Sequence, residues 1–469
     1  MTEYPAGDGA KGAELLRRLR ELLGADRVAA APEELLTYAY DGSGQDYPPA
    51  AVVFPQSSAE IAAILRLAGA SQTPVIPRGA GTGMCGGALA VQGGIILALA
   101  RLNRIIAIDP DNQIAVVQPG VITADLQAEV ARHGLYYPPD PASRAFCTLG
   151  GNVACGAGGP AAVKYGVTRD YVLGLEAVLA SGEIIRTGVR TAKGVVGYDL
   201  TRLLVGSEGT LAVISEITLR LIPLPPAKST LLLLCPDLAR ATALVSAILR
   251  RLTPSTLEYL DRTALALVAD RLPADLRTAP AAALLLLEFA GDEAEIAAQG
   301  RRLEEFIATQ PGVILRRAAS PAEAEQLWAA RRAISPAAFQ LRPHKSSDDV
   351  VVPRSRIPEL VAATEELAAA TGLPIFTFGH AGDGNIHVNI MLDRENDGER
   401  RAAAAAREAI QRRVLELGGT LSGEHGVGIS KAGAIAAEVE PAALELMRKL
   451  KKVFDPANIL NPGKIFPPA

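Results

Sequence analysis

The stretch Pro77-Arg-Gly-Ala-Gly-Thr-Gly-Met-Cys-Gly-Gly87 is the first of three dense glycine-rich loops and decides the fold of the first half of the chain. Glycine lets a backbone approach a phosphate closely, and consecutive amides can form an anion-binding nest. Similar loops follow at 147–159 and 206–210. On strand-rich sequence, three such loops predict an extended ligand with a pyrophosphate. The alternative is that these glycines only serve turns.

The first loop also matches the dinucleotide-binding pattern GxGxxG, from Gly81 to Gly86. A Rossmann fold requires a helix directly after this pattern and an acidic residue about 20 residues on. Here the segments after Gly86 are typical of strands, and no acidic residue ends a second strand at that offset. NAD binding through this loop is therefore disfavoured.

The composition is that of an ordinary globular protein. The chain has 469 residues, a length sufficient for two or three domains. Its net charge is −4, and 49% of its residues are hydrophobic. Basic residues are scattered, so no nucleic-acid partner is expected. The four cysteines (Cys85, Cys147, Cys155 and Cys235) contain no CxxC pair, which argues against a disulfide framework or an iron–sulfur cluster. Neither a signal peptide at 1–5 nor an apolar run of ~20 residues is apparent, so we expect a cytoplasmic protein.

The pattern of apolar runs predicts an α+β chain. Residues 1–45 are expected to form a helical lead-in. Strands are expected at 52–54, 74–77, 94–98 and 114–117, and a helix capped by Ser57 is expected to run through Ala68. A proline cluster at 222–226 indicates a boundary. Beyond it, strands at 229–234 and 283–289 alternate with helices, including the alanine-rich stretch 400–413. We expect parts at 1–45, 46–225, 226–415 and 416–469.

Three of the five histidines lie in two segments of the second half, Phe378-Gly-His-Ala-Gly-Asp-Gly-Asn-Ile-His-Val-Asn389 and Ser422-Gly-Glu-His-Gly426. Asp383-Gly384 favours a type I′ hairpin turn, which would pair His380 with His387. Directly paired residues share a face with Cβ atoms about 4.5–5.5 Å apart, so the two imidazoles could chelate one metal ion. Asn389 would share that face. The alternative is two structural histidines beside a turn.

The chain resembles a known family. Segments 77–87, 138–159, 164–166 and 197–210 are similar to the FAD-binding, PCMH-type domain of vanillyl-alcohol-oxidase-like flavoproteins. The second half resembles their D-2-hydroxyacid dehydrogenase branch, in 327–331, 380–387, 423–426 and 455–464. That branch includes the flavin subunit of glycolate oxidase, D-lactate dehydrogenases and D-2-hydroxyglutarate dehydrogenase. The resemblance implies a FAD-binding domain with an α+β substrate (cap) domain.

The resemblance also implies which residues bind FAD. They are Pro77, Arg78, Gly79, Ala80, Gly81, Thr82, Gly83, Gly86, Gly87, Pro139, Asp140, Thr148, Gly150, Gly151, Asn152, Ala154, Gly158, Gly159, Tyr165, Gly166, Glu208, Gly209, Val213, Ile214 and Asn461. Members with covalent FAD often attach it through a histidine in the first loop. Residues 77–87 contain none, so we expect non-covalent FAD.

Three further roles follow from the resemblance. His380, His387 and Glu424 resemble the ligands of a divalent metal, usually zinc. His425 resembles the catalytic base, Arg331 the arginine that binds the substrate carboxylate, and Asn389 a neighbouring substrate contact. A lysine of some members corresponds to Ser347 here. Lys345, two residues earlier on the same strand face, is a weaker candidate for its role. From the sequence alone, Arg331 could equally be a surface arginine on a helix.

These residues match the oxidation of a 2-hydroxy acid. A planar guanidinium can bind a carboxylate, a metal can polarise the hydroxyl, and a histidine can take its proton. We therefore expect an FAD-dependent dehydrogenase that oxidises a D-2-hydroxy acid, glycolate or D-lactate first, to the 2-oxo acid. Electrons would pass to a quinone, an electron-transfer flavoprotein or an iron–sulfur partner subunit, with the inner membrane reached only through such partners. The alternatives are a zinc-dependent hydrolase without flavin and a non-catalytic subunit of an oxidase complex.

Overall fold

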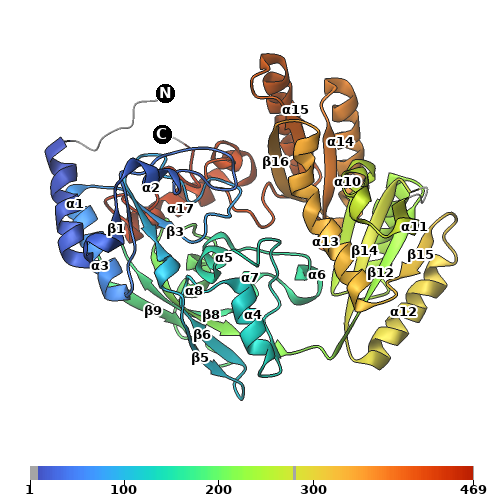
Figure 1. The fold of residues 1–469 in the computed structure, drawn as a ribbon, viewed down its shortest axis with the longest axis horizontal. Helices are drawn as coiled ribbons and strands as arrows, with labels where there is room; N and C mark the ends of the chain where they lie inside the picture. The colour runs from blue at the N-terminus through green and yellow to red at the C-terminus, as the bar shows by residue number, and fades with distance from the viewer. Residues whose placement is uncertain (1–8, 278–280, 468–469) are drawn as a thin grey trace. The chain divides into compact units, whose positions relative to one another are not determined.

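The computed structural model describes residues 9–277 and 281–467. The chain divides into two compact units (Figure 1). The first comprises Met1–Ala157, Val167–Leu224 and Glu424–Ala469, and the second comprises Gly158–Gly166 and Pro225–Gly423. Within the described ranges, no helix is both long and apolar enough to cross a membrane.

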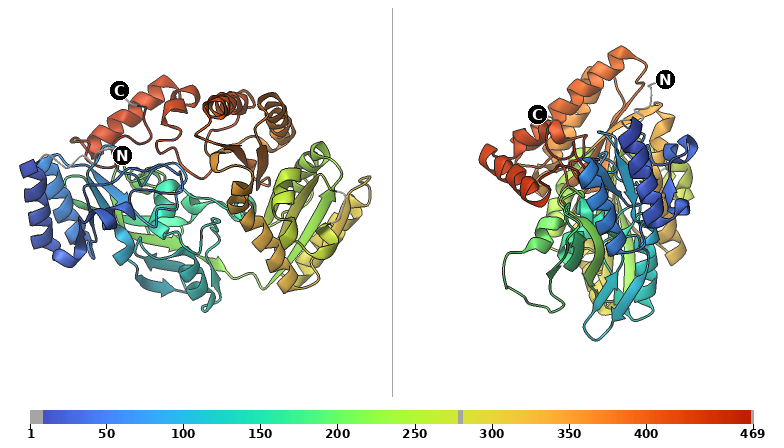
Figure 2. Two further views of the ribbon diagram at one scale, coloured as in Figure 1. Left: turned by 45° about the horizontal axis from the view of Figure 1, so that its top comes forward. Right: turned by 90° about the vertical axis from the view of Figure 1, so that its left-hand side faces the viewer.

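A four-stranded sheet begins the first unit, in the order β1 (Val28–Ala29), β2 (Ala51–Val53), β4 (Ile95–Ala98) and β3 (Val75–Arg78). The last three strands are parallel, and every residue of β4 is buried, as is usual for parallel strands covered on both faces. Helix α3 (Ser58–Ser71) connects β2 to β3 and packs beside α1 (Gly9–Leu23), as the views in Figure 2 show. The short α2 (Pro32–Leu36) precedes β2.

The second sheet of this unit is antiparallel and five-stranded. Its order is β5 (Ile105–Asp109), β6 (Ile114–Val117), β10 (Val213–Arg220), β8 (Val172–Val178) and β9 (Ile184–Gly188). A two-stranded ribbon pairs β7 (Leu135–Tyr136) with β11 (Ile222–Pro223). The helices are α4 (Thr123–Ala131), α5 (Leu149–Cys155), α7 (Thr168–Tyr171), α8 (Leu200–Leu204), α16 (Ile435–Glu438) and α17 (Pro441–Phe454).

The second unit is built on one antiparallel sheet of seven strands. Their order is β15 (Ile314–Arg317), β12 (Ala227–Cys235), β14 (Ala283–Gly291), β13 (Thr256–Asp261), β17 (Ile375–His380), β18 (Asn385–Leu392) and β16 (His344–Val351). The short α6 (Ala162–Tyr165) also belongs to this unit and contacts β13.

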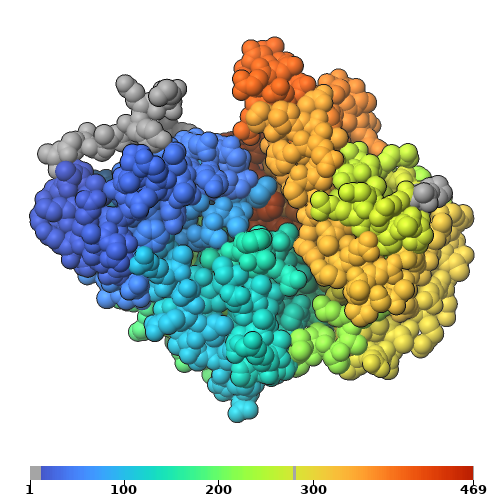
Figure 3. Space-filling model, viewed as in Figure 1, coloured from blue at the N-terminus to red at the C-terminus, as the bar shows by residue number. Residues whose placement is uncertain are grey.

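Alternating residues of these strands divide between two hydrophobic cores. One core lies under α9 (Leu238–Leu249), α12 (Glu293–Ile307), α14 (Ile357–Thr371) and α15 (Asp397–Glu416). The other lies under α10 (Arg262–Leu267), α11 (Ala274–Arg277) and α13 (Pro321–Ala337). Arg301, Arg302, Glu304 and Glu305 of α12 are exposed. Helix α12 lies in the yellow part of the chain in Figure 3.

Most predicted elements are present with small differences at their ends. Helix α3 has Ser57 as its N-cap, whose Oγ accepts a hydrogen bond from the backbone amide of Glu60 at 3.2 Å. The strands near 52, 75, 95 and 114 and the helix over 400–413 are confirmed. The lead-in contains α1 and α2, while residues 1–8, and with them the predicted lack of a signal peptide there, lie outside the described ranges.

The predicted pairing of His380 with His387 is wrong. In the β17–β18 hairpin His380 pairs with Asn385, and His387 pairs with Phe378. The loop is longer than a two-residue turn, and only Gly384 of the predicted turn residues has a positive φ, +91°. A type I′ turn requires positive φ at both central residues. Because the register differs by two residues, both histidines still project from the same sheet face.

Candidate active site

A row of polar side chains crosses four adjacent strands of the second unit's sheet. The β13–β17 register aligns Leu260 with Phe378, which brings Glu258 beside His380. The β18–β16 register pairs His387 with Asp349. All of these residues project from the face covered by α13, where buried polar groups need partners inside the protein.

Glu258 lies at the centre of this row with no exposed surface. Its Oε1 lies 2.6 Å from His380 Nδ1, and its Oε2 accepts a hydrogen bond from Arg331 Nε at 2.7 Å. Burial alone would raise the pKa of Glu258, but the charges and hydrogen bonds of His380 and Arg331 outweigh burial and hold the pKa below its ordinary value. The carboxylate therefore stays ionised.

Arg331 is a buried residue of α13 and not a surface arginine. Its side chain is 9% exposed, and one terminal nitrogen lies 2.6 Å from Glu258 Oε2. The guanidinium carbon lies 4.5 Å from the centroid of the Phe378 ring, a cation–π contact. Glu258 and Phe378 together fix the plane of the guanidinium.

The two predicted metal-ligand histidines lie side by side. The ring centroids of His380 and His387 are 5.1 Å apart, with the rings nearly perpendicular. His387 Nδ1 lies 3.6 Å from Asp349 Oδ1. The Asp349 carboxylate also accepts hydrogen bonds from Asn385 Nδ2 at 2.5 Å and from the Gly423 amide at 3.0 Å.

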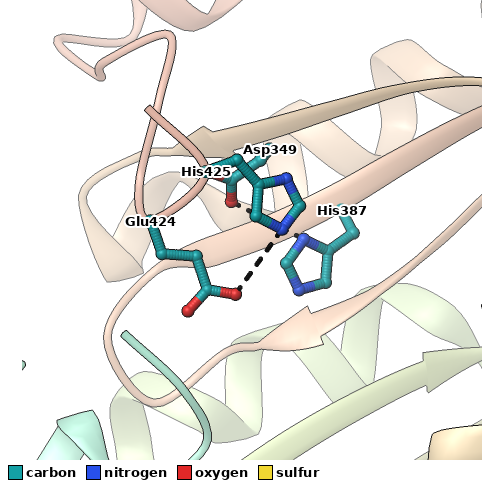
Figure 4. Close-up of side chains that lie close together, drawn as sticks. All are labelled: Asp349, His387, Glu424 and His425. Atoms are coloured by element: carbon teal, nitrogen blue, oxygen red, sulfur yellow. Dashed lines mark ion pairs between the residues drawn. The ribbon is translucent and has the colours of Figure 1, made fainter. Parts of the chain in front are cut away.

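Glu424 and His425 follow directly on Gly423. Ligand atoms of Asp349, His387, Glu424 and His425 lie within 4.8 Å of one another, a spacing that could hold a metal ion. His425 Nε2 lies 3.8 Å from Glu424 Oε1. Figure 4 shows His425 beside Glu424, and His387 beside Asp349. This group differs from the predicted set, because it contains Asp349 and His425 and leaves out His380.

The other predicted substrate contacts lie along β18 and β16. Asn389 is buried beside His387, and its Oδ1 accepts a hydrogen bond from Ser347 Oγ at 3.0 Å. Lys345 donates a hydrogen bond from Nζ to Ser335 Oγ at 2.5 Å and lies 5.7 Å from the Phe339 ring centroid. Burial lowers the pKa of this lysine.

The first unit brings the three glycine-rich loops together. A Cβ added at Gly79 would lie 2.3 Å from Thr148 Oγ1, so the first and second loops approach closely only because residue 79 is glycine. Thr148 caps α5 by accepting a hydrogen bond from the Gly151 amide at 3.3 Å. The third loop joins through the Glu208 amide, which donates to the Ala154 carbonyl at 2.8 Å.

Asn461 connects this cradle to the C-terminal segment. Its Nδ2 donates to the carbonyls of Gly87 at 2.8 Å and Glu208 at 2.7 Å. Its Oδ1 is buried and has no hydrogen-bond partner in residues 9–277 and 281–467. Buried acceptors are normally satisfied, so this oxygen fits a donor on a bound cofactor.

The remaining predicted FAD residues divide between the units. Residues 77–87, 139–154 and 208–214 belong to the first unit, whereas Gly158, Gly159, Tyr165 and Gly166 belong to the second. The Arg78 side chain is buried and does not face solvent. Its Nη2 donates a hydrogen bond to the Tyr40 carbonyl at 2.7 Å.

The sequence interpretation missed Glu258 and Asp349. Glu258 lies between apolar residues in Leu257-Glu258-Tyr259-Leu260, and Asp349 is the second of two adjacent acids, Asp348-Asp349, before Val350-Val351. An acid at such a position is rarely buried without a partner, and this was the available signal.

Comparisons with known proteins agree with this geometry. Residues 224–465 match the family described as FAD linked oxidases, C-terminal domain, and residues 49–188 match the FAD binding domain. The chain belongs to the FAD-linked oxidases. It is 43% identical over 433 residues to the glycolate oxidase subunit GlcD of Bacillus subtilis, covering 92% of each chain. It is 37% identical over 431 residues to a D-lactate dehydrogenase of Anaerostipes hadrus, covering 89% of each.

Solved structures of low sequence identity share the fold of this FAD-linked oxidase. p-Cresol methylhydroxylase with substrate bound has a TM-score of 0.83 at 18% identity, over 98% of both chains. A 4-ethylphenol oxidase from Gulosibacter chungangensis has a TM-score of 0.79 at 18% identity, over 99% of both. The PCMH-type FAD-binding fold, FAD binding and an oxidoreductase activity are thereby confirmed. A flavin-free hydrolase and a non-catalytic subunit are not favoured.

Proposed function

We propose that this FAD-linked oxidase oxidises a small D-2-hydroxy acid to the 2-oxo acid, with glycolate and D-lactate as the first candidates. The observation that carries the proposal is the buried Arg331, held by Glu258 and Phe378 on the sheet face that also presents His380 and His387. Glycolate and lactate, named for the relatives, are both 2-hydroxy acids.

Arg331 would bind the substrate carboxylate. Its Nε edge is used by Glu258, and within residues 9–277 and 281–467 no second carboxylate is paired with it. The far end of the planar guanidinium still offers donors for an oxygen pair. Asn389 lies two residues from His387 on the same strand face and would also contact the substrate.

His380, His387 and Glu424 would hold a divalent metal; of these, His387 and Glu424 belong to the group whose ligand atoms lie within 4.8 Å of one another. Each histidine has a carboxylate at Nδ1, Glu258 for His380 and Asp349 for His387, an arrangement usual for metal-ligating histidines. Asp349 already accepts two hydrogen bonds and is better placed to orient His387 than to bind the ion. When bound, a divalent ion such as zinc would polarise the substrate hydroxyl.

His425 would take the hydroxyl proton. It lies beside Glu424 at the end of the loop that Gly423 anchors on Asp349. Its side chain is 22% exposed, so a proton taken there can pass on to solvent. A positioned general base contributes about 10²–10⁴-fold to rate.

FAD would be held non-covalently by residues 77–87, 148–159 and Asn461, and it supplies the hydride acceptor when bound. The electrons would leave to a quinone or a protein acceptor, either an iron–sulfur or an electron-transfer flavoprotein subunit. The name of the Bacillus relative, a subunit, supports a partner. With such a partner the enzyme would work in the cytoplasm or at the inner membrane surface.

A panel of 2-hydroxy acids tests this function. Anaerobic mixing with the matching D-acid should bleach the flavin absorbance, whereas the corresponding 2-hydroxy amide should not, because it lacks the charge that Arg331 binds. Equal bleaching by acid and amide would remove Arg331 from the substrate site.

A further inference from the structure

We propose that Glu258 is a positioning residue that sets two functional side chains at once, the carboxylate-binding Arg331 and the metal-ligating His380. The inference rests on the proposed function and names a residue that the function itself does not require. It gives a role to an acid that lies at a fully buried strand position.

The carboxylate divides its two oxygens between the two partners. Oε1 lies 2.6 Å from His380 Nδ1, and Oε2 receives Nε and one terminal nitrogen of Arg331 at 2.7 and 2.6 Å. A side-on, two-nitrogen contact defines the guanidinium plane, whereas a single contact would not. Phe378 under the guanidinium, at 4.5 Å, restricts the remaining tilt.

The contact with His380 has a separate consequence. At 2.6 Å from Glu258 Oε1, Nδ1 of His380 is the ring nitrogen that donates to the carboxylate. A histidine held in this way by a carboxylate presents Nε2, its other ring nitrogen, to a metal. Glu258 therefore determines the orientation of two side chains: the metal ligand His380 and the guanidinium of Arg331, which binds the substrate carboxylate.

Glu258→Gln is the discriminating variant. The amide has the size of the carboxylate, but it has no negative charge and only one oxygen that can accept a hydrogen bond, so it cannot accept from both His380 and Arg331. Glu288→Gln is its matched control. Glu288 is a mostly buried acid of the neighbouring β14, and it pairs with Lys228 at 3.0 Å and contacts none of the proposed site residues.

Three readouts are compared on purified holoenzyme with equal FAD content. Zinc affinity is measured by competition with a chelator, oxalate binding by perturbation of the flavin spectrum, and turnover as KM and kcat separately. Glu258→Gln should weaken zinc binding by roughly 10–100-fold, the usual effect of losing an outer carboxylate, and should weaken oxalate binding and raise KM. Glu288→Gln should match the wild type in all three.

Glu258→Gln that binds zinc and oxalate as tightly as Glu288→Gln would overturn the proposal and leave Glu258 as a structural counter-charge. If Glu258→Gln fails to fold, Glu258→Asp keeps the charge but is too short to reach both partners, and the same losses are expected from it. Wild-type enzyme that binds neither zinc nor oxalate would instead refute the proposed function. The two failures are therefore distinguishable.

Discussion

Asp349 and His387 face each other across β16 and β18, with Asp349 Oδ1 3.6 Å from His387 Nδ1. Asp349 is fully buried, and its carboxylate also accepts hydrogen bonds from the Asn385 side chain and the Gly423 amide. The same carboxylate thus contacts a candidate metal ligand and anchors the loop that leads to Glu424 and His425. Its neighbour Asp348 projects from the opposite face, where it pairs with Arg407.

Asp349→Asn should therefore lose metal, whereas Asp348→Asn should lose stability. Asparagine at 349 has no negative charge to pair with Nδ1 of His387, and we expect metal affinity to fall roughly 10–100-fold. Asp348→Asn breaks a partly buried ion pair and should cost about 1–3 kcal/mol of folding free energy while metal content is retained. Metal analysis and thermal unfolding of the two variants separate the effects. Similar metal content in both variants would remove Asp349 from the site.

The comparison of these two neighbours shows how far the sequence could predict the site. His387, Glu424 and His425 stand out because histidine is rare in this chain and these lie among glycines. Asp349 and Glu258 depend on the β16–β18 and β13–β17 registers, which join segments distant in the sequence. The β17–β18 register itself was predicted wrongly because Asp383-Gly384 suggested a shorter loop than 381–384. The elements around 52–117 were predictable because capping and apolar runs are local signals, whereas the contact of Arg331 with Glu258 joins distant segments.

Gly79→Ala should weaken FAD binding. The added Cβ would lie 2.3 Å from Thr148 Oγ1, and moving Thr148 would break the cap on the Gly151 amide. Overpacking of this kind costs about 1–3 kcal/mol, which corresponds to roughly tenfold or more in FAD affinity. The FAD released into the supernatant by acid precipitation measures occupancy. Gly433→Ala, which meets no atom within 4 Å, is the control, and equal occupancy in both variants would contradict the cradle.

His425→Ala should keep FAD and metal but lose flavin reduction. A general base contributes about 10²–10⁴-fold, and we expect a loss of this order in the reductive half-reaction. Stopped-flow reduction of variant enzyme with full FAD content is the measurement. Reduction at the wild-type rate would show that the proton goes elsewhere, and loss of FAD or of folding would indicate a structural histidine.

The buried carboxyl of Asp261, which lies outside the proposed site, should make the folding stability depend on pH. Burial raises the pKa of Asp261 to about 6, although it caps α10 and accepts hydrogen bonds from Thr377. The unfolded carboxyl loses its proton near pH 4, so between pH 4 and 6 the folded chain holds more protons and its stability falls as pH rises. The loss is roughly 3 kcal/mol and is complete above pH 6. The Tm of Asp261→Asn should rise relative to wild type across this window, and a constant difference would contradict the assignment.

In the proposed reaction, hydride leaves C2 of a 2-hydroxy acid for the flavin bound by this chain. Anaerobic stopped-flow reduction of the wild-type holoenzyme tests this step, with D-lactate, D-lactate deuterated at C2, glycolate and C2-deuterated glycolate as substrates. We expect the flavin absorbance to bleach with at least one of the two acids, and more slowly with the deuterated form of that acid. A flavin that remains oxidised with both acids, or reduction with no isotope effect in single-turnover chemistry, would contradict the account.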